Sequence, residues 1–106
     1  MITFEDFKKL DLRIARILEV EKHPDADKLY IIKIAYQDKE KQLVAGIRQY
    51  YEADELIGKQ IVVVDNLEPV SIRGVESQGM LLAAKDVEGL TILTTDREVQ
   101  PGSKVS

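Results

Sequence analysis

The sequence predicts an all-β protein, a five-stranded Greek-key barrel of the OB class with short helices and an extra C-terminal strand and tail. Three observations carry this prediction. Short stretches rich in β-branched residues alternate between apolar and polar side chains, as strands do. A helix-like segment separates the third stretch from the fourth, and a long connection follows the fourth. This order matches an OB barrel, although a small β-sandwich is the competing fold.

The first elements are a capped helix and a long strand. Thr3 and Asp6 resemble a capping-box pair ahead of the helix-like stretch FEDFKKL. Residues 12–22 alternate as a strand that bends near Arg16 and Ile17. The apolar side of this strand is expected to hold Leu12, Ile14, Leu18 and Val20. The turn residues of HPDADK (23–28) end it.

Further strands follow at regular spacing. They are predicted at residues 30–36, 42–46, 59–65, 79–84 and 90–95. A short helix at 52–57 ends before Gly58, which suits the left-handed position after a helix. The segment 66–78 is expected to be one long connecting loop, and the tail after residue 96 a turn and an edge.

Composition limits the classes of function. The chain has 106 residues, 44% hydrophobic residues and no cysteine, which predicts one domain (1–106) without disulfides or thiolate metal sites. We expect a cytoplasmic protein with neither a membrane span nor an export signal. The net charge is −4, with +1 in residues 1–48 and −5 in residues 49–106. A nucleic-acid ligand would therefore have to be recognised by shape and by a local cationic face.

No motif indicates catalysis or a cofactor. The single histidine, His23, lies beside Asp25 and Asp27, but HPD is more often a loop whose aspartate caps the next segment. We expect a structural role for His23 and no metal. The six glycines form no phosphate-binding motif.

Candidate binding residues lie on the second strand and in the long connection. If the tyrosine side of the second strand is core, Lys33 faces outward, and Arg48 follows the third strand. Arg73 and Ser77, in a connection where Gly74 permits unusual backbone, offer hydrogen bonds to phosphate or ribose. A plain structured connection is the alternative.

Four motifs in order carry a resemblance. They are DLRIARI (11–17), HPDADKLY (23–30), NLEP (66–69) and RGVESQGMLLAA (73–84). Together they resemble the tRNA-binding domain family, the OB-fold module at the C-terminus of many methionyl-tRNA synthetases, in the endothelial-monocyte-activating cytokine precursor and in free-standing tRNA-binding proteins. The resemblance runs from Phe4 to the C-terminus. The third strand ends in Ala45-Gly46 where the family often has Ser-Gly.

The resemblance implies a ligand, an oligomer and site residues. It implies tRNA binding at the outer corner of the L with little sequence preference, a homodimer, an association with methionyl-tRNA synthetase, and no catalytic activity of its own. The RNA-binding side is implied at Asn66, Arg73, Ser77 and Met80, to which the strand argument adds Lys33 and Arg48. Met80 fits an RNA contact or a core position equally well. An export-related, peptide-binding chaperone of the same fold is the alternative, and extracellular signalling is a third.

Overall fold

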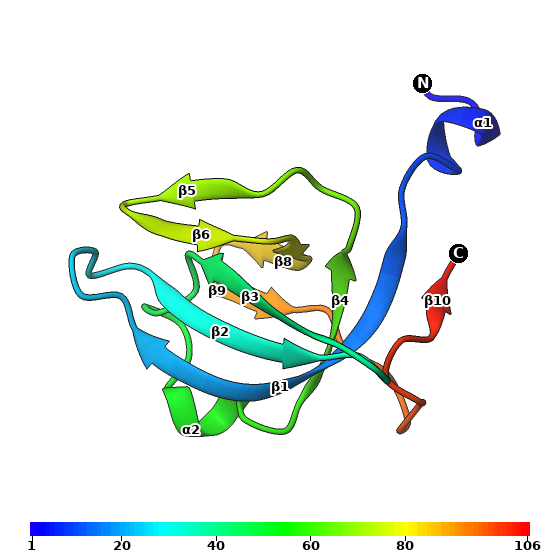
Figure 1. The fold of residues 1–106 in the computed structure, drawn as a ribbon. Helices are drawn as coiled ribbons and strands as arrows, with labels where there is room; N and C mark the ends of the chain where they lie inside the picture. Colours follow the sequence, from blue (N-terminus) through cyan, green and yellow to red (C-terminus); the bar gives the residue numbers. More distant parts are fainter.

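The computed structural model describes residues 1–106 as a barrel of antiparallel strands with short helices and two small hairpins outside it (Figure 1). The helices are α1 (Phe4–Phe7) and α2 (Ala53–Leu56). The strands are β1 (Leu12–Lys22), β2 (Tyr30–Ala35), β3 (Glu40–Ala45), β4 (Gln60–Val64), β5 (Val70–Ile72), β6 (Val75–Ser77), β7 (Met80–Leu81), β8 (Ala83–Asp86), β9 (Gly89–Ile92) and β10 (Lys104–Val105). No helix is long and apolar enough to span a bilayer.

The barrel consists of five strands in the order β3-β2-β1-β4-β7, and β7 returns to contact β3. Gly79 lies at this closure, where an added Cβ would stand 2.9 Å from the Val64 carbonyl oxygen. Only glycine fits so close to a neighbouring backbone, so Gly79 permits β7 to enter the barrel. The predicted barrel and its helix between the third and fourth strands are confirmed.

The long strand β1 bends where the sequence predicts a bend. Its register against β2 shifts between Ile17 and Glu19, which is a β-bulge. Ala15 and Ile17, which precede the bulge, point into the barrel core, and Val20, which follows it, packs against that core. The prediction that Leu12, Ile14, Leu18 and Val20 share one apolar side is wrong in part. Leu12 and Ile14 are buried in a second cluster with Val62 and Val64, and Leu18, which alternates away from Ile17, is 37% exposed.

The tyrosine side of β2 faces the core, as predicted. Tyr30, Ile32, Ile34 and Tyr36 are all buried, whereas Lys33 is exposed on the outer face. Lys33 lies opposite Glu19 of β1 and Gln42 of β3. The alternation of this strand therefore places one cation on the outside of the barrel, on the β2–β3 face.

The segment predicted as one long loop contains a hairpin. Strands β5 and β6 pair with Ile72 opposite Val75, and Arg73 and Gly74 form the two-residue turn with φ values of 52° and 86°. Two consecutive positive φ values define a type I′ turn, the form that matches strand twist. The predicted buried strand 79–84 is also wrong in part, because it divides into β7 and β8, and β8 leaves the barrel to form an exposed hairpin with β9.

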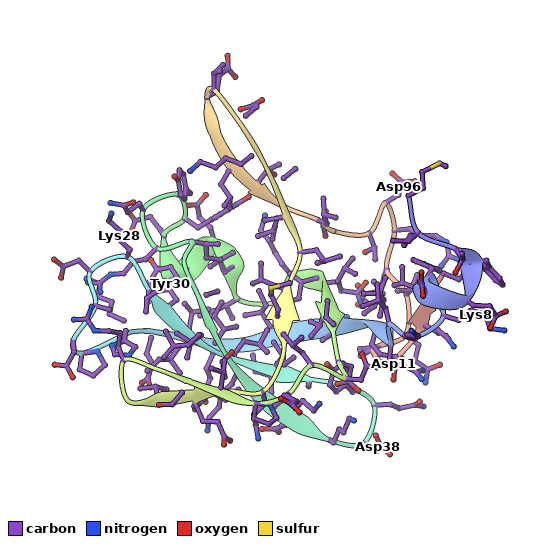
Figure 2. The ribbon with its side chains drawn as sticks, turned by 90° about the horizontal axis from the view of Figure 1, so that it is seen from above. Lys8, Asp11, Lys28, Tyr30, Asp38 and Asp96 are labelled. Carbon is purple, nitrogen blue, oxygen red and sulfur yellow. The ribbon has the colours of Figure 1, made fainter.

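The barrel has two ends, which carry different parts of the chain. The loop end consists of residues 23–28, 46–51 and the β5–β6 turn, and the tip of the β8–β9 hairpin approaches it where Tyr50 lies against Gly89. The terminal end consists of α1, the β2–β3 turn, the end of β4 and β10. Figure 2 places Lys28 of the loop end and Lys8 of the terminal end on opposite sides of the molecule.

Candidate nucleic-acid interface

The loop 23–28 is fixed through His23, which is 2% exposed. The Asp25 N–H donates to Nδ1 at 3.0 Å, and Nε2 lies 3.1 Å from the Ile72 carbonyl oxygen. Since an amide donates to Nδ1, Nε2 carries the proton and donates to Ile72, and the ring is neutral. Both nitrogens are engaged, which confirms the predicted structural role. His23 joins the β1–β2 loop to the β5–β6 hairpin.

Two arginines bind the same loop from either side. The Arg48 guanidinium donates to the Ala26 carbonyl at 3.1 Å, and the Arg73 guanidinium donates to the Asp25 carbonyl at 2.8 Å. A guanidinium has five N–H donors, so each arginine keeps donors for a ligand. Arg73 is exposed at the tip of the hairpin, whereas Arg48 is half-buried. The sequence-predicted residues Arg48 and Arg73 therefore meet at one loop.

The cations of this region lack carboxylate partners. Of 15 lysines and arginines in the chain, six are in ion pairs, which leaves nine. Six of these nine lie at the loop end, on the outer face of β2 or on β8: Lys22, Lys28, Lys33, Arg48, Arg73 and Lys85. Asp25 and Asp27 lie among them, but neither forms an ion pair. Free cations beside a rigid loop suit an anionic ligand.

An uncharged groove adjoins these cations. It has a volume of about 330 Å³ and lies between the β5–β6 hairpin, the end of β3 and the start of β8. Its lining is Val44, Ala45, Gly46, Ile47, Leu67, Val70, Ile72, Ser77, Gly79, Met80, Leu81, Ala83 and Leu90. We call it the apolar groove. Met80 is 50% exposed on its wall, so it is not a core residue.

Ser77 is buried at the bottom of this region. Its Oγ accepts a hydrogen bond from the Val44 N–H and donates to the Gly79 carbonyl, both at 3.0 Å. The next residue, Gln78, exchanges two bonds of 2.8 Å with the Gln42 backbone. These bonds fasten β6 to the edge of β3, and they leave the Ser77 hydroxyl engaged within the protein.

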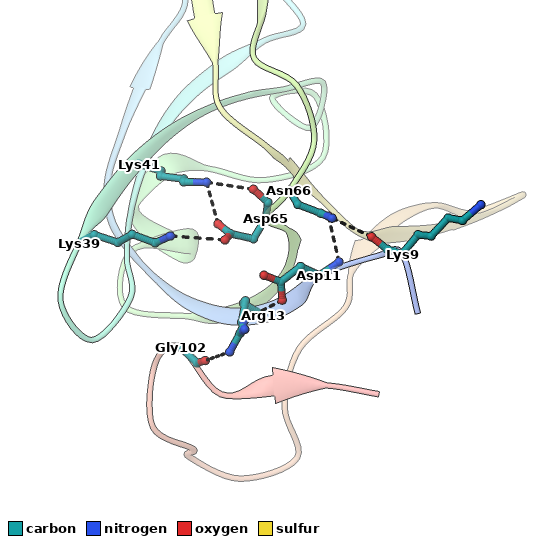
Figure 3. Close-up of polar contacts among 8 residues, drawn as sticks. All are labelled: Lys9, Asp11, Arg13, Lys39, Lys41, Asp65, Asn66 and Gly102. Carbon is teal, nitrogen blue, oxygen red and sulfur yellow. Dashed lines mark hydrogen bonds and ion pairs between the residues drawn. The ribbon is translucent and has the colours of Figure 1, made fainter. Parts of the chain in front are cut away.

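Asn66 lies at the terminal end, away from Arg73. Its Oδ1 accepts from the Asp11 N–H at 2.9 Å, and its Nδ2 donates to the Lys9 carbonyl at 2.7 Å (Figure 3). The amide therefore fixes the segment between α1 and β1 against the end of β4. The structure does not bring Asn66 together with the other predicted residues.

Asp65 beside it is the least exposed of the carboxylates that form ion pairs. Its carboxylate is 12% exposed and lies 2.8 Å from the Lys41 ammonium and 3.4 Å from that of Lys39 (Figure 3). Burial alone would raise the pKa of Asp65, but Lys41, Tyr36 and Lys39 together outweigh it and lower this pKa below its ordinary value. Burial and the carboxylate of Asp65 raise the pKa of Tyr36.

The sequence did not predict the pairing of Lys85 with Tyr50 at the loop end. The Lys85 ammonium lies 5.8 Å from the centroid of the Tyr50 ring, and Tyr50 is 38% exposed. A cation above an exposed ring joins two groups that both suit RNA, one for phosphate and one for a base. The residues are 35 positions apart, and no local pattern connects them.

The fold thus defines a class of protein: a small OB-type barrel with free cations, rather than a catalytic cluster, at one end. The chain matches the family model described as "Putative tRNA binding domain" over residues 12–104, and it belongs to that family. This confirms the resemblance seen in the four motifs.

Relatives and solved structures agree with this family. The chain is 54% identical over 104 residues to the methionine–tRNA ligase of Pyrococcus horikoshii and 53% identical over 105 residues to that of Thermotoga maritima. These matches cover 98% and 99% of the chain but only 14% and 17% of the two ligases.

Two solved structures are similar over the whole chain. The crystal structure of a MetRS-related protein from Pyrococcus horikoshii has a TM-score of 0.93 and 30% identity, covering 100% of this chain and 98% of that one. The CsaA chaperone protein from Picrophilus torridus has a TM-score of 0.93 and 38% identity, covering 100% of both.

Proposed function

We propose that the domain binds tRNA through the loop end of the barrel and performs no chemistry itself. The observation that carries this proposal is the group of free cations around loop 23–28. Together with membership of the family, it favours a polyanionic ligand over an uncharged one. Double-stranded RNA is recognised mostly through shape, phosphates and 2′-hydroxyls. The ligand surface is the outer corner of the L, bound with little sequence preference.

The predicted site residues take two kinds of role in this proposal. Lys33, Arg73 and Met80 are exposed and contact the RNA directly. Arg48, Ser77 and Asn66 act mainly as positioning residues, since their polar groups bind backbone atoms of the protein. Arg48 also retains free N–H donors that reach a phosphate when RNA is bound.

We further propose that two copies associate through the terminal end. Several large apolar side chains are exposed there, including Ile2 at 70%, Phe4 at 72% and Leu10 at 43%. A hollow of about 290 Å³ lies beside them, lined by Phe4, Phe7 and Val105 among others. A second copy would bury this patch symmetrically and leave both loop ends free for tRNA.

In the cell, the domain works in the cytoplasm as an auxiliary part or partner of methionyl-tRNA synthetase. The 54% identity to a segment that makes up 14% of a methionine–tRNA ligase supports this setting. A noncatalytic module raises the effective concentration of tRNA near the enzyme to which it is joined or docked. The CsaA likeness offers a peptide-binding function as the second candidate, for which the apolar groove is the favouring observation.

A tRNA gel shift of the wild type and Arg73→Ala tests the proposal, with a sizing column alongside. We expect Arg73→Ala to weaken tRNA binding about tenfold, a loss of about 1.4 kcal/mol, and to elute like the wild type. Lys39→Ala removes the same charge at the terminal end and is expected to bind like the wild type. Equal affinity of Arg73→Ala and the wild type would show that the hairpin tip is not part of the surface that contacts tRNA.

A further inference from the structure

The apolar groove is open in a domain whose other loop-end groups are polar. None of its thirteen lining residues carries a charge, and ten are hydrophobic. Three of its lining residues are about half exposed: Leu67 at 44%, Val70 at 52% and Met80 at 50%. Exposed apolar side chains gathered in one hollow mark a binding site more often than scattered ones do.

The groove is held open by the bonds that fix its walls. The Ser77 hydroxyl and Gln78 fasten β6 to β3, and His23 fastens the Ile72 carbonyl at the other end of the hairpin. Because both ends are fixed, the hairpin does not close over the floor formed by Val44 and Leu81. A site formed in advance loses little free energy to ordering when a ligand enters.

Two free cations belong to strands and turns that line the groove, although neither side chain lines it. Arg73 directly follows the lining residue Ile72, and Lys85 lies two positions beyond Ala83, on the same face of β8. The Lys85 ammonium extends toward the Tyr50 ring. The groove therefore has an apolar floor and adjoins elements that carry free cations, and sites for single-stranded nucleic acid combine these two features.

We propose that the apolar groove receives one unstacked nucleobase of the bound RNA, while Arg73 and Lys85 bind the flanking phosphates. This inference rests on the proposed tRNA binding and makes it more specific. A volume of about 330 Å³ lies at the small end of ligand pockets, which suits one flat ring rather than a length of peptide. Bases in RNA loops are free to leave the stack and pack against protein side chains.

The chemistry of the lining also predicts which features of a base the groove does not recognise. Ser77 is its only residue with a polar side chain, and that hydroxyl is engaged by Val44 and Gly79. The side chains therefore contact the faces of a base and not its hydrogen-bonding edges. The Met80 thioether suits an aromatic ring of any kind. Any of the four bases fits, in agreement with binding that has little sequence preference.

Substitutions at two adjacent residues separate the effect of a charge inside the groove from the effect of the same charge elsewhere on β8. Ala83 lines it, while Ala84 points to the opposite face of β8, and both are exposed. Ala83→Glu and Ala84→Glu add the same negative charge to the same strand, so they differ only in whether the carboxylate enters the groove. Thermal melts establish that both variants are folded.

The experiment measures the binding of each protein to tRNA transcripts assembled from synthetic halves, each with one abasic nucleotide in the D or T loop. For the wild type and Ala84→Glu, we expect one abasic position to weaken binding about tenfold, and any base at that position to restore it. We expect Ala83→Glu to bind the intact transcript about tenfold more weakly than Ala84→Glu and to be insensitive to that abasic position.

The results separate this inference from the proposed function. If the wild type binds no tRNA, both fail. If the wild type binds tRNA, but Ala83→Glu matches Ala84→Glu or every abasic transcript binds alike, only the groove inference is overturned. A fluorescent unfolded peptide provides the third arm. Peptide binding that Ala83→Glu abolishes, with tRNA affinity equal in the two variants, would assign the groove to peptides instead.

Discussion

At the terminal end, most lysines and arginines are paired with carboxylates, Lys104 being the exception, whereas at the loop end none is in an ion pair. Lys41 and Lys39 share Asp65, and Arg13 pairs with Asp11 at 2.7 Å. In contrast, Arg48 and Arg73 donate to backbone carbonyls and keep their full charge available. The difference shows how a chain of net charge −4 can attract a polyanion. Acids neutralise cations at one end and leave them exposed at the other.

The apolar residues differ between the ends as well. The terminal end exposes large side chains such as Phe4 and Leu10 on its outer surface, which suits a flat contact with another copy. The loop end gathers Leu67, Val70 and Met80 in the apolar groove and also exposes Tyr50 outside it. This difference is the basis of the two proposals, a contact between copies at the terminal end and RNA binding at the loop end.

The largest expected effect comes from removing free cations, which reduces the charge difference between the two ends. The double variant Lys33→Ala/Arg73→Ala removes two free cations, and we expect tRNA affinity to fall about 100-fold, or about 2.7 kcal/mol. If about four phosphates are neutralised in the wild type, log affinity falls with log salt at a slope near −3, and the double variant should show about half that slope. Titration at several salt concentrations measures both quantities.

The matched control removes two paired cations. Lys9→Ala/Lys39→Ala changes the net charge by the same amount at the terminal end. We expect its affinity to stay within about threefold of the wild type, with an unchanged salt slope. A loss as large as that of the first double variant would mean that total charge, and not its position, determines binding.

The second prediction concerns the terminal end. Phe4→Asp places a charge in the proposed contact between copies, and an acid in the first turn of α1 does not disturb the helix. We expect dimer affinity to fall by about 2 kcal/mol, seen as a monomer in light scattering coupled to a sizing column. Val87→Asp is the control, since Val87 is fully exposed at the β8–β9 tip. A wild type that elutes as a monomer contradicts the dimer.

A third, smaller effect tests the bonds that hold the groove open. Ser77→Ala leaves the Val44 N–H and the Gly79 carbonyl without their partner. We expect its free energy of unfolding, measured in urea, to be about 1–2 kcal/mol lower than that of the wild type. Ser71→Ala, on the exposed strand β5, should stay within about 0.5 kcal/mol. Equal stability of both variants would show that Ser77 does not fasten β6 to β3.

The smallest expected effect is a pH dependence from Asp65. Its folded pKa lies below the unfolded value of 3.8, so its contribution to stability is present above that pH and is lost as pH falls through the lowered folded pKa. We expect Asp65→Asn to be less stable by about 1 kcal/mol at pH 7 and to lose less stability than the wild type between pH 5 and pH 2. Parallel urea titrations at the two pH limits measure this. Identical acid profiles would contradict the assignment.

The local features of the fold were predictable from the sequence. The period-2 pattern of residues 30–36 indicates which face of β2 is core, and Thr3 and Asp6 form the predicted capping box with bonds of 3.1 and 3.3 Å. The β5–β6 hairpin was missed because Arg-Gly is a less usual type I′ turn than Asn-Gly. Leu18 was misplaced because Ala15 and Ile17 face the barrel core and the alternation reverses only after Ile17, at a bulge whose position depends on pairing with β2.

The site was predictable only as a set of residue types. Whether a cation is free depends on contacts between distant residues, such as Lys41 with Asp65 or Arg16 with Glu98, which lie 24 and 82 positions apart. The same holds for Asn66, whose partner Asp11 is 55 positions away. Periodicity describes near neighbours, so it does not distinguish an engaged side chain from an available one.

Hydrogen–deuterium exchange with and without tRNA tests the central claim most directly, because it reports on both ends of the barrel in one experiment. We predict slowed exchange in residues 23–28, in 46–51 and around the β5–β6 turn, with little change in α1, the β2–β3 turn and β10. Slowed exchange confined to the terminal end, or none anywhere at low salt, would contradict the account.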